Sequence, residues 1–143
     1  MKVLFLCHGN VNRSAAAEII CKHDYPNLEV KSAGLKTSNG RITAKKMRET
    51  LSDFGYPEPS IRSSIATKEL VDWADKVFYM DDANAKRFIE QFGEQQKAQK
   101  LSDYIPGVNK IPDPAFAEGK EMHERVVLLI KEALKRWDTE ITD

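Results

Sequence analysis

The chain has 143 residues, a length typical of one domain that buries a substantial core without disulfides or a structural metal. Its 22 basic and 22 acidic residues balance, so no overall charge favours nucleic acid or an anionic membrane surface as a partner. The apolar start is too short for a signal-peptide core or a membrane span, and two cysteines form no disulfide framework, so the sequence predicts a single domain over residues 1–143 in the reducing cytoplasm.

The first predicted element is a buried strand, because residues 3–6 are an uninterrupted apolar run, Val-Leu-Phe-Leu. A small, polar loop then leads into a helix expected from about Ser14 to His23, with Ser14 as its N-cap. Such a loop points free backbone N–H groups at one spot, which favours an anion and phosphate in particular. The loop begins with the thiol of Cys7 and ends with the guanidinium of Arg13.

The rest of the chain continues to alternate between strands and helices. Residues 28–31 and 76–80 are the next predicted strands, and residues 100–102 are a weak candidate for a fourth. Helices are expected over residues 43–54, 68–74, 83–92 and 118–137, the last of them amphipathic. This alternation predicts an α/β fold, in which a parallel sheet lies between layers of helices.

Polar and reactive side chains follow each predicted strand. Cys7 follows the first, Ser32 the second and Asp81-Asp82 the third, while Asp113 lies in the loop after the fourth. Ligands of parallel sheets sit beyond the carboxyl ends of the strands. We therefore expect these residues to meet in one site.

The loop after the first strand suits nucleophilic attack on phosphorus. Helix amides, Arg13 and the hydroxyl of Ser14 would all favour the thiolate of Cys7, although a lone cysteine can also be a small buried residue. Arg13 could clamp phosphoryl oxygens with two parallel hydrogen bonds, and the positive end of the helix dipole argues for an anionic partner beside it. Gly9 and Asn10 suit positive φ in a tight cradle, as they would in an ordinary turn.

Asp113 is the candidate general acid. It lies in the segment Ile-Pro-Asp-Pro, where the two flanking prolines restrict the backbone. A general acid needs such fixed placement, because its proton must reach the leaving oxygen within hydrogen-bond distance. An aspartate in an ordinary turn would fit the same local sequence.

Taken together, these features resemble the low-molecular-weight protein tyrosine phosphatases. The resemblance covers essentially the whole chain and rests on four motifs in the order of that family: Cys7-x5-Arg13-Ser14, Ser32-Ala33-Gly34, Met80-Asp81 and Asp113-Pro114. It implies a four-stranded parallel sheet flanked by helices. It also implies that Cys7 is the nucleophile, that Arg13 binds phosphate and that Asp113 acts first as acid and then as base.

The same resemblance implies a phosphatase that hydrolyses phosphotyrosine or aryl phosphate monoesters through a phosphocysteine intermediate, with no cofactor and no metal. Its partner would be a phosphotyrosine-containing protein or a small aryl phosphate, rather than nucleic acid or a membrane, and the protein would be a monomer or a weak dimer. The expected substrate-binding residues are His8, Gly9, Asn10, Val11, Asn12, Ser14 and Phe116, with Ser32 and Asp81 in support. Ser32 would order Asn10.

Several positions depart from the family pattern. Asn12 stands where many members have a second cysteine, Ala15 where proline is usual, and Ala115-Phe116 where two tyrosines are common. Residues 35–39 contain no aromatic side chain, so Phe116 and Leu35 are the candidate apolar walls for a phosphotyrosine ring. The departures change the expected pocket walls and leave the catalytic residue types in place.

Two other functions are compatible with a loop of this kind. An arsenate reductase of the same fold needs further cysteines to pass on a disulfide, and no cysteine follows Cys21. A non-catalytic phosphate-binding module would have little need for Cys7 or Asp113, and both are present.

Overall fold

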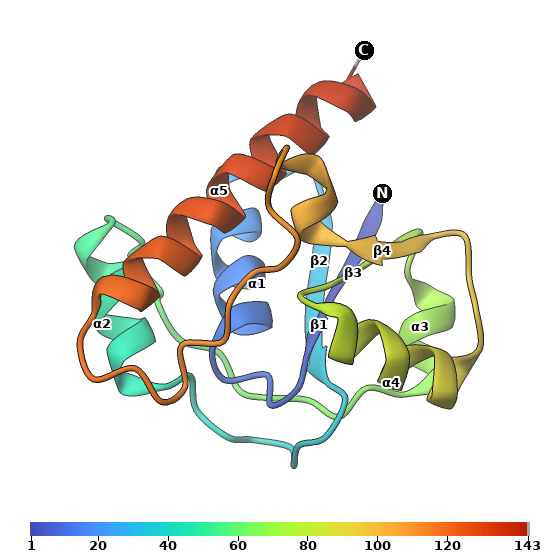
Figure 1. Ribbon diagram of the computed structural model, residues 1–143, viewed down its shortest axis with the longest axis horizontal. Coiled ribbons are helices and arrows are strands. Elements are labelled where there is room, and N and C mark those ends of the chain that lie inside the picture. Colours follow the sequence, from blue (N-terminus) through green and yellow to red (C-terminus); the bar gives the residue numbers. More distant parts are fainter. Residues whose placement is uncertain (143) are drawn as a thin grey trace.

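The computed structural model describes residues 1–142, which form one parallel sheet with helices on both faces (Figure 1). Its strands are β1 (Lys2–Cys7), β2 (Glu29–Gly34), β3 (Lys76–Tyr79) and β4 (Ala98–Lys100). They are hydrogen-bonded in the order β2-β1-β3-β4, and every neighbouring pair is parallel. The predicted α/β fold with a four-stranded parallel sheet is confirmed.

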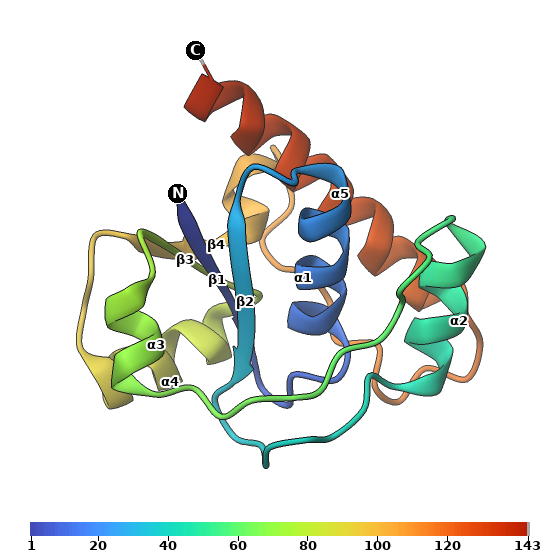
Figure 2. The same ribbon diagram turned by 180° about the vertical axis from the view of Figure 1, so that it is seen from behind.

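Five α-helices flank the sheet. They are α1 (Arg13–Asp24), α2 (Lys45–Asp53), α3 (Lys68–Trp73), α4 (Asp82–Phe92) and α5 (Glu121–Thr142), and a 3-10 turn spans Leu101–Tyr104. Helices α1 and α5 cover one face of the sheet and α3 and α4 the other, as the front and back views show (Figure 1 and Figure 2), while α2 packs beside α5. Within residues 1–142, none of the helices combines the length and the apolar character that a bilayer crossing requires.

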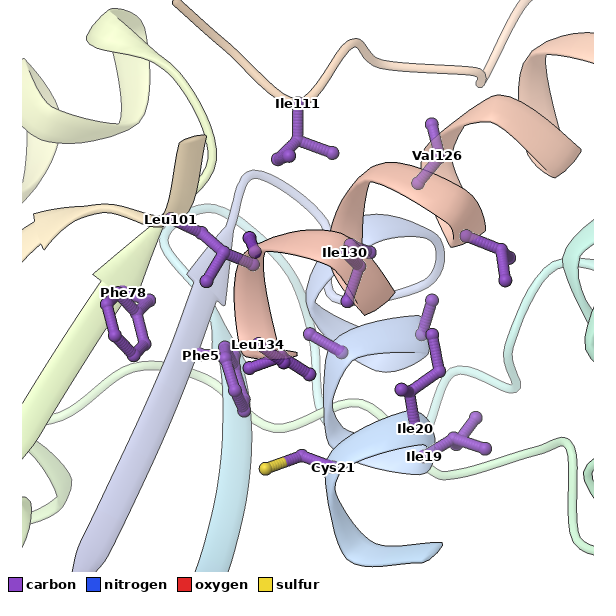
Figure 3. Packing of buried hydrophobic residues seen from close by; sticks show 14 of the residues in the cluster. Phe5, Ile19, Ile20, Cys21, Phe78, Leu101, Ile111, Val126, Ile130 and Leu134 are labelled. Carbon is purple, nitrogen blue, oxygen red and sulfur yellow. The ribbon is translucent and has the colours of Figure 1, made fainter. Parts of the chain in front are cut away.

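The core is divided by the sheet into two clusters, which explains the unbroken apolar run of β1. Phe5 packs with α1 and α5 on one face, whereas Leu4 and Leu6 pack with α3 and α4 on the other. Phe5 stacks on Phe78 of β3 with ring centroids 5.8 Å apart, and Ile20, Ile130 and Leu134 close over them from the helices (Figure 3). A strand that is buried on both faces needs apolar residues at every position.

The strand ends bring three chain segments together at one edge of the sheet. Cys7 at the end of β1 pairs with Gly34 at the end of β2, and Leu6 pairs with Tyr79 at the end of β3. The loops that follow these strands therefore begin side by side, at the lower edge of the sheet in Figure 1. This edge is where a parallel sheet presents its ligand site.

Two predictions about the start of the site are wrong. Ser32 lies inside β2 rather than after it, because the ladder with β1 continues to Gly34, whose amide also donates a hydrogen bond to the Ser64 carbonyl. Ser14 does not cap α1. Asn12 precedes the helix, without a capping hydrogen bond from its side chain, and the Ser14 hydroxyl contacts Cys7 instead.

Other element boundaries shift for local reasons. Helix α2 begins at Lys45 rather than at Thr43. The hydroxyl of Thr43 accepts a hydrogen bond from the Ile61 amide and does not cap the helix. Residues 101–102 belong to the 3-10 turn, and β4 ends before them. Helix α5 begins at Glu121, after Ala117 and Glu118, whose carbonyls accept hydrogen bonds from Lys46 Nζ. Helix α3 is capped by the side chain of Thr67, and α4 is capped by the side chain of Asp81.

Candidate active site

The loop between β1 and α1 is built around Asn10, the one non-glycine residue with positive φ (57°) among residues 1–142. Its side chain is completely buried, and its Nδ2 donates to Ser14 Oγ at 2.7 Å and to Ser32 Oγ at 2.9 Å. Its Oδ1 accepts from the Ser64 amide at 2.9 Å. Every polar hydrogen of the carboxamide is thus used to hold the loop, and the expected contact between Asn10 and Ser32 is present.

A buried carboxylate that the sequence analysis did not identify extends this network. The Ser32 hydroxyl donates to Glu18 Oε1 at 2.8 Å, and the other oxygen of Glu18 pairs with Lys22 at 2.8 Å. The only signal in the sequence was the i, i+4 spacing of Glu18 and Lys22, which is ordinary on helix surfaces. The network ties the loop to both β2 and α1.

Loss of this network should be measurable without any substrate. We expect Asn10→Ala to lower the free energy of unfolding by about 3 kcal/mol, since three buried groups lose their partners. Asn10→Gly loses the same bonds but permits positive φ, so it should be less damaging than alanine by about 1 kcal/mol. Urea unfolding measures both, with Asn39→Ala as the control, because the exposed Asn39 also binds this segment through the Ile65 amide. An Asn39 variant as unstable as Asn10→Ala would contradict the assignment.

Cys7 lies at the floor of the loop and is 3% exposed. Its Sγ is 3.0 Å from Ser14 Oγ and accepts a hydrogen bond from the Asn10 amide at 3.3 Å. Because Ser14 Oγ already accepts from Asn10 Nδ2, its own hydrogen is free to point at the sulfur. Two hydrogen-bond donors, the Ser14 hydroxyl and the Asn10 amide, are thus available to the sulfur.

The second cysteine cannot assist the first. Cys21 is completely buried among core residues (Figure 3), and burial, then the charges of Asp24 and Asp138, raise its pKa to about 12. It therefore stays a thiol, which is the unreactive form. Position 12, where a second thiol would face the cleft, is occupied by asparagine.

We expect limited peroxide to oxidise Cys7 to sulfinic acid, because no thiol is placed to trap the sulfenic acid as a disulfide. Mass spectrometry of the peptide that contains Cys7 measures the gain of two oxygens. The matched variant Asn12→Cys should instead give a disulfide within the loop that thiol reverses. A disulfide between Cys7 and Cys21 in the unmodified chain would contradict this expectation.

Arg13 joins the loop to the segments after β3 and β4. It is 3% exposed, and its Nη1 donates to Asp81 Oδ2 at 2.7 Å and to the Ile111 carbonyl at 3.0 Å. Its Nη2 lies 3.8 Å from Asp113 Oδ2. The guanidinium is thereby held in one orientation at the mouth of the loop, with Nη2 toward Asp113.

Asp81 supports this orientation and also caps α4, because its Oδ1 accepts from the Asn84 amide at 2.7 Å. Burial alone would raise the pKa of Asp81. The hydrogen bonds from Arg13 and Asn84 and the charges of Arg13 and Lys110 outweigh it and hold that pKa below its usual value. Asp81 is therefore ionised near neutral pH, as a partner of Arg13 must be.

These groups face an open cleft of about 480 Å³. It is lined by the three candidate catalytic residues, Cys7, Arg13 and Asp113, and by five of the expected binding residues, His8, Gly9, Val11, Asn12 and Phe116. The side chains of Asn10, Ser14 and Ser32 do not line the cleft and lie beneath it as its support.

The apolar walls differ from expectation. Leu35 is buried in the core cluster under α3 and α4 and forms no wall of the cleft. Phe116 does line the cleft but is 99% exposed, so its ring stands free at the edge. Arg41, which the sequence analysis did not single out, contributes to the lining.

Comparison with known proteins agrees with this geometry. A family model described as low molecular weight phosphotyrosine protein phosphatase matches residues 2–143. The chain is 30% identical over 125 residues to the low molecular weight protein-tyrosine-phosphatase PtpB of Staphylococcus epidermidis, covering 87% of this chain and 88% of that protein. It is 34% identical over 116 residues to the protein-arginine-phosphatase of Geobacillus stearothermophilus, covering 79% and 78%. The crystal structure of a YwlE mutant from Bacillus subtilis superimposes with a TM-score of 0.91 at 26% identity, covering 100% of this chain and 99% of that one.

Proposed function

The chain belongs to the low molecular weight phosphotyrosine protein phosphatase family, and on that basis we propose that it hydrolyses phosphotyrosine through a phosphocysteine at Cys7. The observation that carries the proposal is the placement of three groups around one cleft: the Cys7 sulfur with two hydrogen-bond partners, the fixed guanidinium of Arg13, and the half-exposed carboxyl of Asp113 beside it. Together they supply a nucleophile, a phosphate clamp and an acid.

In the first step the Cys7 thiolate attacks phosphorus in line with the leaving oxygen. The new P–S bond forms as the P–O bond breaks, and Asp113 transfers its proton to the departing phenolate. Arg13 and the amides of the loop hold the three remaining oxygens, where charge accumulates in the transition state. The acid must therefore be protonated when the substrate binds.

In the second step water attacks the phosphocysteine. Asp113, now a carboxylate, takes a proton from that water, and the P–S bond breaks as inorganic phosphate forms. The departing thiolate is received by the Ser14 hydroxyl and the Asn10 amide, which are the groups that contact the sulfur in the structure. Asp81 acts through Arg13, whose orientation it maintains.

The cleft favours an aryl substrate. The sulfur is 3% exposed, so a substrate must be long enough to reach the floor, and Val11, Ala115 and Phe116 give the cleft apolar surface for a flat ring. One relative is the protein-arginine-phosphatase of Geobacillus stearothermophilus, so phosphoarginine is the competing substrate. A phosphoarginine side chain would bring a guanidinium toward the cation of Arg41, which disfavours it.

The decisive experiment compares phosphate release from three peptides of one sequence that carry phosphotyrosine, phosphoserine or phosphoarginine. We expect the wild-type protein to turn over the phosphotyrosine peptide fastest by kcat/KM, with Cys7→Ser as the blank in every assay. Faster release from the phosphoarginine peptide would assign the relative's activity to this chain and overturn the proposed substrate. Release by the Cys7→Ser protein would overturn the mechanism.

A further inference from the structure

Arg41 is a cation on the rim of the cleft that has no role in the steps above. It is exposed, and its Nη1 lies 3.5 Å from the point where a Cβ on Gly9 would be, directly against the phosphate-binding loop. The two arginines of the cleft differ in their partners: Arg13 lies between Asp81 and Asp113, whereas no carboxylate of residues 1–142 forms an ion pair with Arg41. Its charge is available to a substrate.

The position of Arg41 is fixed by the fold. Its backbone is held from both sides by the buried Ser63, whose Oγ accepts from the Arg41 amide at 2.9 Å and whose amide donates to the Arg41 carbonyl at 2.8 Å. Its guanidinium donates to Thr37 Oγ1 at 3.4 Å, and the same hydroxyl donates to the Gly9 carbonyl at 2.8 Å. Thr37 thus links Arg41 to the loop that would hold the phosphate.

A close backbone contact explains why this link is tight. A Cβ on Gly34 would lie 2.6 Å from Thr37 Cγ2 and 3.0 Å from the His8 carbonyl, so only glycine lets the segment after β2 pack against the loop. The next residue but one, Lys36, donates its amide to the His8 carbonyl at 2.9 Å. The segment is therefore packed against the loop at His8, and both His8 and Arg41 line the cleft.

We propose that Arg41 binds an acidic side chain next to the phosphotyrosine and makes the enzyme prefer acidic phosphotyrosine peptides. The inference rests on the proposed function, since it assigns a specificity residue to the same site. A guanidinium pairs with a carboxylate through two parallel hydrogen bonds, which suits a flanking aspartate or glutamate. The phosphate itself is taken by Arg13 and the loop amides, so Arg41 acts on a neighbouring residue of the substrate. Because the pair would be exposed to water, a factor of about three to five in affinity is expected.

The test uses two phosphotyrosine peptides that differ only in having glutamate or glutamine on both sides of the phosphotyrosine. For the wild-type protein we expect a KM about three to five times lower for the glutamate peptide, at similar kcat. In Arg41→Gln the ratio of the two KM values should fall to about one. Arg62→Gln is the matched control, because Arg62 is exposed, lies opposite Ile42 in the same loop pair and bonds Gly40, yet it does not line the cleft. It should keep the wild-type ratio.

The outcomes separate this inference from the proposed function. Hydrolysis of both peptides with equal KM by the wild-type protein would overturn the role of Arg41 and leave the phosphatase assignment standing. If Arg62→Gln also lost the KM preference for the glutamate peptide, the preference would come from the general positive charge of this surface. That result would also overturn the role of Arg41. An equally large loss in Arg41→Gln with para-nitrophenyl phosphate, which has no flanking residue, would place Arg41 on the phosphoryl group instead. Failure of the wild-type protein to hydrolyse any of the three substrates would instead refute the proposed function.

Discussion

Cys7→Ser should lose turnover of aryl phosphates by a factor of roughly 10⁴ or more. A serine hydroxyl stays protonated at neutral pH, so position 7 would no longer supply the anionic nucleophile that the proposed mechanism requires. Rapid mixing with substrate followed by an acid quench should trap phosphorus on the wild-type peptide that contains Cys7, and steady-state phosphate release measures the loss.

The control for this experiment is Cys21→Ala. Cys21 is completely buried in the core, and its raised pKa keeps it a thiol, so Cys21→Ala should keep the trapped phosphorus and most of the turnover. The variant should be less stable, because the substitution leaves a cavity in the core. Chelators should leave all rates unchanged, because no step uses a metal. Full turnover by Cys7→Ser would eliminate the phosphocysteine mechanism.

Asp113→Ala should lower kcat by about 100-fold or more for substrates with poor leaving groups, because the departing oxygen then receives no proton. The loss should shrink for nitrophenyl phosphate, whose leaving group is stable as an anion. A plot of log kcat against leaving-group pKa measures this, and its slope should become steeper in the variant than in the wild-type protein.

Two neighbouring carboxylates test the assignment of the acid. Asp82 is exposed and pairs with Lys100, so Asp82→Ala should change little. Asp81→Asn should slow all substrates to a similar degree, since it loosens Arg13 without removing the acid. If Asp81→Asn steepened the leaving-group dependence and Asp113→Ala did not, the acid would be Asp81.

The sequence predicted correctly the fold and the meeting of the strand ends, because these follow from the local apolar pattern and from the topology of a parallel sheet. An unbroken apolar run gives a strand buried on both faces, and the polar break at Cys7 locates its end, because few other structures satisfy that pattern. The three strand ends meet because parallel strands must point the same way, which brings Arg13 to Asp81 and Asp113. The motif order then identifies the family.

The parts it missed depend on contacts that exist only in the folded chain. Ser14 is a good capping residue by type, but Cys7 and Asn10 compete for its hydroxyl, and that competition exists only once the loop has folded. Arg41 reaches the cleft because Ser63, 22 residues later, holds its backbone. Leu35 turns into the core as the chain leaves β2, so an apolar residue near the site does not become part of its wall.

The fixed guanidinium of Arg13 has a consequence for the end of the catalytic cycle. Asp81 and the Ile111 carbonyl, both groups of the protein itself, hold Arg13, so the side chain gives up its rotational freedom during folding rather than on binding. A cradle prepared in this way recognises the tetrahedral dianion whether or not an organic group is attached. In the proposed reaction, inorganic phosphate leaves with the same three oxygens that the cradle holds throughout. We therefore expect inorganic phosphate to inhibit the enzyme, so that its flux depends on the surrounding phosphate concentration.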